Sequence, residues 1–346
     1  MCVASKPKRK PAKQPTKKGR AALQWLGGLF LLSALAGGGT GFFAWYSYIK
    51  PGLLPEAIDV VVPHGGYAST LNALQHAQVL PSGWFTDKLF VTAISLTRKS
   101  GQLHAAELHF PQHVSMQDVL FILRHGKPVL HKLTIPEGLS ARQIQAVIAS
   151  APFLEGETPL PTEGSILPQT YNYLRNSERA DIVKRAQNAM QTALDTVWQK
   201  HDPALDGMIP SPQLLLVLAS LIEKETALPA ERPMVARVFL NRLQKGMKLQ
   251  TDPTVIYAIT HGNPPLGRAL TRTDLATPDA YNTYVVTGLP PGPICSPGMS
   301  ALEAAAHPAS GDALFFVANG NGGHNFSTTL AEHNRNVSAF RQHNTH

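Results

Sequence analysis

One long apolar stretch lies near the N-terminus, and shorter apolar runs separated by turns follow it. Residues 21–49 contain no charged side chain, and aromatic residues lie near both ends of the stretch. A helix of this length can cross the roughly 30 Å hydrocarbon core of a bilayer. A cleaved signal peptide is the alternative, but its apolar region is usually shorter. The pattern therefore predicts one transmembrane helix over 21–49.

A small unit of alternating strands and helices is expected over residues 50–127. A β-branched run at 58–62 ends at a proline and a glycine pair, which predicts a strand and a turn. Residues 71–80 and 84–96 have helical spacing, and 108–110 form a second apolar run. Ser115 precedes a further helical pattern and is expected to be its N-cap.

The remainder, residues 128–346, predicts a mixed α/β domain. Alternation over 129–135 predicts a strand, and Ser140 is expected to cap the helix that follows. Residues 178–200 form an amphipathic helical pattern, and 214–222 are almost wholly apolar, which predicts a helix buried on all sides. With the N-terminal helix and the small unit, the fold class expected is α+β.

Charge adds an orientation to this arrangement. The net charge is +8, but residues 1–20 hold eight basic groups and no acidic one, which leaves 23 Lys and Arg against 23 Asp and Glu in the rest. The body is therefore neutral, and no nucleic-acid surface is predicted. The positive-inside rule places residues 1–20 in the cytoplasm and the part after the helix on the other side, the periplasm in a bacterial cell.

Cysteine and histidine patterns predict neither a disulfide nor a bound metal. The membrane would separate Cys2 from Cys295, and Cys295 is expected to be a packed small residue. The 14 histidines include no His-Glu-x-x-His motif and no common zinc spacing. The glycines at 320–323 lack the lysine of a phosphate-binding loop and are expected to form a hairpin loop. No cofactor is predicted.

The end of the buried helix carries the strongest candidate chemistry. Glu223 follows the apolar run directly, within the sequence Glu-Lys-Glu-Thr. A carboxyl group on the last turn of a buried helix loses water, and this raises its pKa toward that of a general acid at neutral pH. Periodicity alone also allows a solvated glutamate where the helix emerges.

Ordered motifs downstream make the chain similar to a known family. They include Asn241-Arg242-Leu243, the run from Met247 to Tyr257, Tyr281-Asn282-Thr283-Tyr284, and Gly322-Gly323-His324-Asn325-Phe326. With these motifs the chain resembles the YceG-like endolytic murein transglycosylases. A further family motif matches residues 163–171, with Gln169 and Ile166 in place of the usual Asp and Leu. No acidic role is therefore expected at position 169.

The resemblance implies an enzyme of the bacterial inner membrane that cuts peptidoglycan strands internally. It would cleave between MurNAc and GlcNAc, leave 1,6-anhydro-MurNAc ends, and use Glu223 as general acid and base. The resemblance also implies a LysM-like module at 50–127, a role in ending strand elongation, and proximity to peptidoglycan synthases.

Several polar and aromatic residues of the same motifs are candidate sugar-binding groups, because they offer hydrogen bonds and ring faces. They are Gln250, Asp252, Tyr257, Tyr281, Asn282, Thr283, Tyr284 and His324. Turn and core roles are the alternative for each.

Two other functions stay open from the sequence. A hydrolase would need a second carboxylate, for which Glu225, Asp252 and Asp274 are candidates. A non-catalytic glycan-binding or scaffold protein of the wall-synthesis machinery would bind strands without cutting them.

Overall fold

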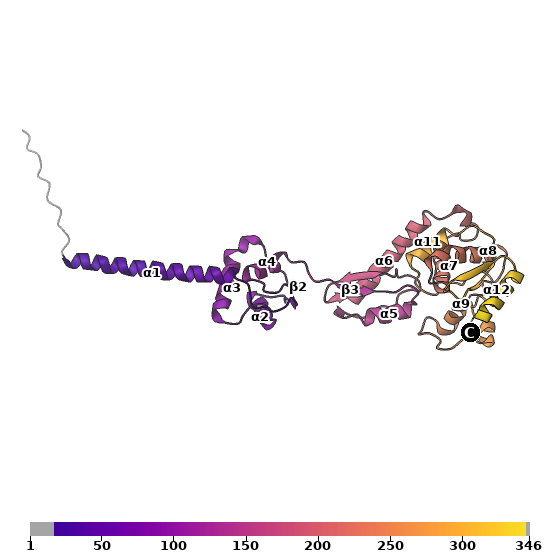
Figure 1. Cartoon of the computed structure of the whole chain (residues 1–346), viewed down its shortest axis with the longest axis horizontal. Helices are drawn as coiled ribbons and strands as arrows, with labels where there is room; N and C mark the ends of the chain where they lie inside the picture. The colour runs from indigo at the N-terminus through magenta and orange to yellow at the C-terminus, as the bar shows by residue number, and fades with distance from the viewer. Residues whose placement is uncertain (1–16, 344–346) are drawn as a thin grey trace, which may run out of the picture. The chain divides into compact units, whose positions relative to one another are not determined.

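The computed structural model describes residues 17–343, and its contacts divide the chain into one unit that ends at Val129 and a second that begins at Leu130 (Figure 1). Cys2 and most of the predicted basic tail, residues 1–16, lie outside the described residues. Each unit has its own apolar core.

The N-terminal apolar segment forms one continuous helix, α1, over Lys17–Ile49. Its 33 residues make it about 50 Å long at 1.5 Å per residue. The part over Gly28–Ile49 is long and apolar enough to cross a membrane, and none of it is buried within the structure. Near the end of α1, Tyr48 packs against the core of the N-terminal unit.

The rest of the N-terminal unit follows the predicted order of strand, two helices, strand and helix. Strands β1 (Ile58–Val61) and β2 (Glu107–Phe110) pair antiparallel. The helices are α2 (Tyr67–His76), α3 (Trp84–Leu96) and α4 (Met116–His125). The Ser115 hydroxyl accepts the Asp118 backbone N–H at 3.1 Å, which confirms the predicted cap of α4.

The first half of the C-terminal unit combines two small sheets with two helices. Strand β3 (His131–Thr134) pairs antiparallel with β5 (Thr170–Tyr173), and β4 (Leu154–Glu155) pairs parallel with β6 (Ser177–Glu178). The helices are α5 (Ala141–Ala149) and α6 (Arg179–Trp198). Ser140 caps α5 in a capping box with Gln143, so this predicted cap is also confirmed.

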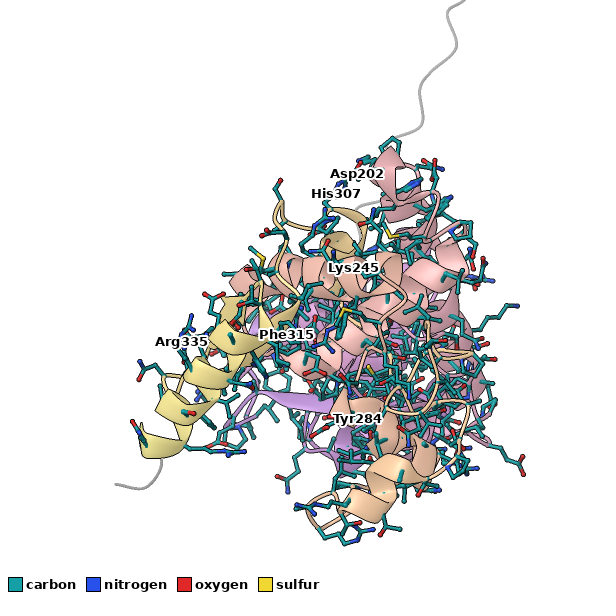
Figure 2. All side chains as sticks on the ribbon, turned by 90° about the vertical axis from the view of Figure 1, so that its right-hand side faces the viewer. Asp202, Lys245, Tyr284, His307, Phe315 and Arg335 are labelled. Carbon is teal, nitrogen blue, oxygen red and sulfur yellow. The ribbon has the colours of Figure 1, made fainter. Side chains whose placement is uncertain are left out.

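The second half of this unit is built around helix α7 (Pro212–Glu225), which packs against α6, α8, α9 and α11. The remaining elements are α8 (Arg232–Gln244), α9 (Asp252–Thr260), α10 (Arg272–Ala276), α11 (Met299–Ala306), β7 (Phe315–Ala318), β8 (His324–Ser327) and α12 (Leu330–His343). Strands β7 and β8 form an antiparallel hairpin beside α12, as Phe315 and Arg335 show in Figure 2. The mixed helix and strand prediction is thus confirmed.

A buried arginine on α8 joins this helix to two loops. The Arg242 Nε donates to the Leu314 carbonyl at 2.7 Å, and its guanidinium also donates to the Leu249 carbonyl at 2.7 Å. Only about a tenth of the residue is exposed. Hydrogen bonds from a charged donor are strong in the interior, and an acceptor that loses its donor there costs stability. Arg242 therefore holds the segment before α9 and the segment before β7 against α8.

We predict that Arg242→Met lowers the free energy of unfolding of the C-terminal unit by about 3 kcal/mol, because two buried carbonyls lose their donor. Trp198 is the one tryptophan of residues 130–346. Its fluorescence during urea unfolding, with the other three tryptophans changed to phenylalanine, measures this unit alone.

The matched control is Lys245→Met, which removes a positive charge from an exposed position just after α8. It should change the free energy of unfolding by about 0.5 kcal/mol or less. Equal stability of the two variants would contradict the assigned role of Arg242.

Candidate active site

Four consecutive residues at the end of α7 each contact a different part of the C-terminal unit. Ser211 caps the start of the helix. Residues 217–222 are buried, as the apolar run predicts, whereas Leu214 and Leu216 are only partly buried. The Lys224 amine then donates to the Gly138 carbonyl at 3.3 Å, and the Thr226 hydroxyl donates to Glu231 at 3.3 Å. Glu223 and Glu225, which alternate with these two residues, contact separate partners.

Glu223 is held at both carboxylate oxygens. The Arg232 guanidinium donates to Oε1 at 2.8 Å, and the Gly298 backbone N–H donates to Oε2 at 2.9 Å. The Glu223 side chain is only 5% exposed. Burial raises the pKa of Glu223 above its ordinary value, although Gly298 and Arg232 oppose the shift. The carboxyl group therefore holds a proton at higher pH than a solvated glutamate does.

A second carboxylate, Glu137, lies beside this group, although no sequence motif indicates it. Glu137 Oε2 accepts from Arg232 at 3.4 Å, so two carboxylates share one guanidinium. Its side chain is 47% exposed and packs on Gly298, where a Cβ atom would lie 1.8 Å from Glu137 Oε1. Glu137 is part of a Pro-Glu-Gly turn that marks a bend and gives no sign of this contact.

Glu225 faces a different set of groups. The Thr251 hydroxyl donates a short hydrogen bond to Glu225 Oε1, and burial raises the pKa of Glu225, with the Thr251 bond opposing the shift. Nearby, the Tyr284 hydroxyl donates to Asp252 at 2.6 Å. The structure thus brings two predicted sugar-binding residues, Asp252 and Tyr284, into direct contact with each other.

Tyr257 and Tyr281 form a second pair of predicted residues. Their ring centroids are 4.8 Å apart, and the Tyr257 hydroxyl donates to Glu163 at 3.2 Å. Burial raises the pKa of Glu163, which also accepts the Ala141 N–H at the start of α5. Tyr257 lines a cavity of about 100 Å³ whose wall also includes Lys224 and Gly138. Lys224, the residue after Glu223, therefore shares a cavity wall with an aromatic side chain, whereas Glu223 itself is not among the residues that line this cavity.

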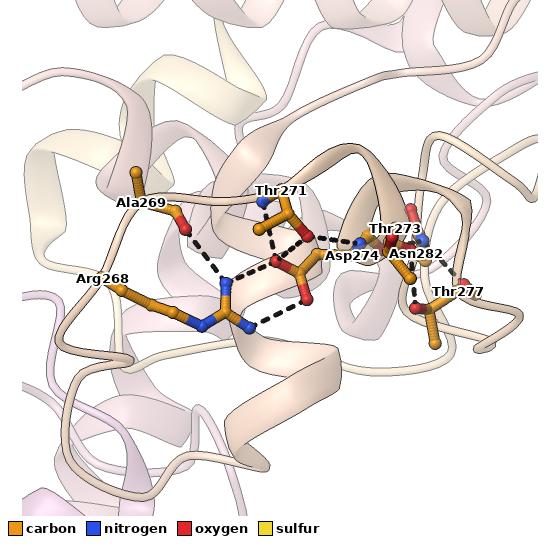
Figure 3. Close-up of polar contacts among 7 residues, drawn as sticks. All are labelled: Arg268, Ala269, Thr271, Thr273, Asp274, Thr277 and Asn282. Atoms are coloured by element: carbon orange, nitrogen blue, oxygen red, sulfur yellow. Dashed lines mark hydrogen bonds and ion pairs between the residues drawn. The ribbon is translucent and has the colours of Figure 1, made fainter.

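Asn282 and Thr283 lie inside the loop that follows α10, where both are fully buried. The Asn282 amide donates to backbone carbonyls, including that of Thr277 at 2.8 Å, as Figure 3 shows. The Thr283 hydroxyl contacts that of Thr254 at 2.8 Å. Gln250 is exposed, and its backbone N–H donates to the Thr283 carbonyl. Asn282 and Thr283 are therefore buried, and their polar groups form hydrogen bonds within the C-terminal unit.

Two further candidate residues, His324 and Asp274, are hydrogen-bonded to neighbouring side chains. His324 Nδ1 lies 2.7 Å from Glu231, which also accepts the His324 backbone N–H. Burial alone would raise the pKa of Glu231, but the His324 bonds bring it below its ordinary value. Asp274 accepts two hydrogen bonds from Arg268, at 2.6 and 3.0 Å, in the loop of Figure 3.

Within residues 17–343, no group of three or more His, Cys, Asp or Glu side chains could hold a metal ion. Cys295 is buried, and its thiol contacts the Ser220 carbonyl at 3.4 Å. Burial raises the pKa of Cys295, so the thiol stays protonated, as expected of a packed residue.

Comparison with known proteins gives consistent matches. The model of the YceG-like family matches residues 60–339. An endolytic murein transglycosylase of Bacillus subtilis is 42% identical over 176 residues, which are 51% of this chain and 47% of that protein. One of Streptococcus pneumoniae is 26% identical over 365 aligned positions, 89% of this chain and 63% of that protein. The chain thus spans about half to two thirds of the length of these curated relatives.

A solved structure extends the comparison to the fold. The crystal structure of a YceG-like protein from Listeria monocytogenes is 29% identical and superimposes with a TM-score of 0.52. The match covers 81% of this chain and 98% of that one.

We predict that the free energy of unfolding of Glu223→Gln increases relative to that of the parent as the pH rises from 4 to 8. Because the folded pKa of Glu223 is raised, the folded state binds this proton more tightly than the unfolded chain does. The parent therefore loses stability as the pH rises through the folded pKa, and the neutral amide does not. Urea unfolding followed by Trp198 fluorescence at several pH values measures the difference.

Asp274→Asn is a control for which we expect the opposite pH dependence of stability. The Arg268 hydrogen bonds, followed by those of Thr271, lower the pKa of Asp274, so its contribution is present above about pH 4 and is lost as the pH falls. The amide should therefore be less stable than the parent at pH 7 and approach it in acid. The same pH trend in both variants would contradict the two opposite shifts.

Proposed function

The chain belongs to the YceG-like family, and from this premise we propose that it is a lytic transglycosylase that cuts murein strands internally, with Glu223 as its single general acid and base. The observation that carries the proposal is the Glu223 carboxyl, buried on the last turn of α7 and held by Arg232 and Gly298. The relatives' printed names supply the substrate class.

In the proposed reaction, Glu223 donates one proton to the substrate and then accepts another from it. The protonated Glu223 donates its proton to the glycosidic oxygen as the bond from MurNAc C1 to that oxygen breaks, which releases the GlcNAc 4-hydroxyl. The MurNAc 6-hydroxyl then attacks C1, and its proton passes to the carboxylate. The product is a 1,6-anhydro ring, no water is consumed, and Glu223 is protonated again.

The surroundings of Glu223 suit both protonation states. Burial favours the neutral acid before the bond breaks, whereas Arg232 and the Gly298 N–H stabilise the carboxylate that forms next. Lys224, the residue after Glu223, and Gly138 line a cavity together with Tyr257, whose ring suits a sugar face. Glu225 is the weaker candidate because Thr251 binds its carboxyl on another side.

A hydrolase would need a second carboxylate with a free oxygen near the cleaved bond. Asp274 is bound by Arg268, and Asp252 is bound by Tyr284. Glu137 is the half-exposed carboxylate that shares Arg232 with Glu223. It is therefore the residue to test if the products prove to be hydrolytic.

We further propose that α1 anchors the enzyme in the bacterial inner membrane, with residues 1–20 in the cytoplasm and the C-terminal unit in the periplasm. None of the Gly28–Ile49 window is buried, although Phe43 and Tyr48 near its end contact the N-terminal unit, and lipid would cover its remaining apolar surface. An anchored enzyme would act near the membrane on new strands. It would end their elongation there beside the peptidoglycan synthases.

We predict that Glu223→Gln lowers the rate of strand cleavage by a factor of about 10² to 10⁴, the range expected for loss of a general acid. The full chain in neutral detergent is incubated with purified murein strands, and mass spectrometry identifies the new ends. The parent should produce 1,6-anhydro-MurNAc ends, and these should disappear in the variant.

Glu303→Gln, which changes an exposed glutamate of α11, is the matched control and should cut as fast as the parent. Reducing ends that depend on Glu137 would show a hydrolase instead. Strand binding without cleavage by the parent would show a scaffold protein, and undiminished cleavage by Glu223→Gln would show another acid.

A further inference from the structure

The N-terminal unit contains a cavity that the proposed reaction does not use. It has a volume of about 720 Å³ and lies where the loop after β1, residues 62–67, meets the loop before β2, residues 98–105. The end of α4 completes its wall with Arg124. This cavity is larger than the one beside Tyr257 in the C-terminal unit.

The Lys and Arg residues that line this cavity are not accompanied by an acidic residue in its described wall. Arg98, Lys99 and Arg124 belong to its wall, and no Asp or Glu is among the described residues that line it. Tyr67 and Leu103 add an aromatic ring and an apolar side chain. A concave surface with several cations, no acid and an apolar side suits an organic anion.

Arg124 is the most informative of these cations because it is buried without a counter-ion. The residue is 6% exposed, and its one hydrogen bond is a long one, 3.5 Å from its guanidinium to the Ile94 carbonyl. Its Nε is buried and has no partner, and no described acidic residue forms an ion pair with it. A buried cation in this state costs stability unless an anion binds it.

The position of Arg124 on α4 does not remove this cost. A positive charge on the last turn of a helix interacts favourably with the helix dipole. That interaction is weaker than the cost of burying an unpaired charge. A long apolar side chain such as Met would fill the same space without the cost.

We propose that this cavity binds a carboxylate of an organic ligand, with Arg124 as its main contact and Arg98 and Lys99 at its rim. Planar guanidinium groups bind carboxylates through paired hydrogen bonds. The identity of this ligand rests on the proposed function: if the chain acts on murein, the carboxylate belongs to a peptide of the murein strand. The cavity would then hold the strand by its peptide while the C-terminal unit cuts the sugar chain.

The place of the cavity along the β1–β2 pair favours a wall ligand over a lipid headgroup. The chain that leaves α1 joins one end of this pair, where the Gly52 N–H donates to the His113 carbonyl at 3.0 Å. The cavity lies at the other end, where Val61 pairs with Glu107. The four residues of β1 separate the two ends by roughly 10 Å.

The test is calorimetric binding of N-acetylmuramyl-L-alanyl-D-isoglutamine to the full chain in neutral detergent. This probe has one free carboxylate and no glycosidic bond between sugars, so it cannot be cut. The parent should bind it, and its amide-capped form should bind at least tenfold more weakly. Arg124→Met should weaken binding of the uncapped probe at least tenfold without lowering the thermal unfolding temperature.

Lys88→Met is the matched control, because it removes an exposed cation of α3 that does not line the cavity. It should bind the probe as the parent does. The double change Arg98→Ala with Lys99→Ala alters exposed rim residues and should weaken binding severalfold. This second variant keeps the test decisive if Arg124→Met fails to fold.

Three results would overturn the proposal: no binding by the parent, binding that both sets of variants leave unchanged, or equal binding of the capped and uncapped probes. Arg124-dependent binding of glycerol 3-phosphate in place of the muramyl peptide would also overturn it and indicate a lipid headgroup. Failure of strand cleavage with intact probe binding would refute the proposed function and leave the carboxylate site standing.

Discussion

The burial of helix α7 is the constraint on which the C-terminal unit depends. Residues 217–222 contact the core on every side, and four neighbouring helices are positioned around them. The helix can end only where polar groups find partners, and its last turn supplies four such groups in succession. Glu223 is one of them, so the same packing that stabilises the unit also removes water from this carboxyl.

The partners of Glu223 come from segments that are held independently. Arg232 starts α8, which packs on α7, and Gly298 precedes α11, which packs on both helices. Gly298 also contacts Glu137, and a side chain at position 298 would collide with it. Positioning of the carboxyl therefore follows from helix packing and from one close backbone approach, rather than from a flexible loop.

The sequence predicted those features that depend on local pattern. The apolar run before Glu223 indicated a buried helix and a desolvated carboxyl, and Ser115 and Ser140 marked true helix starts. It did not reveal Arg232 and Glu137 as one cluster, because the two residues are 95 positions apart and meet only in the fold. Asn282 looked like a sugar-binding amide, but its donors satisfy backbone carbonyls of its own loop.

The central claim is that burial keeps the Glu223 carboxyl protonated at a pH at which a solvated glutamate has lost its proton. Its direct test is an infrared titration of the carboxyl C=O band of the full chain, with Glu223→Gln subtracted to isolate this group. The account predicts a pKa above the ordinary 4.5 of a glutamate. A pKa at or below that value would contradict it, because Arg232 and Gly298 would then outweigh burial.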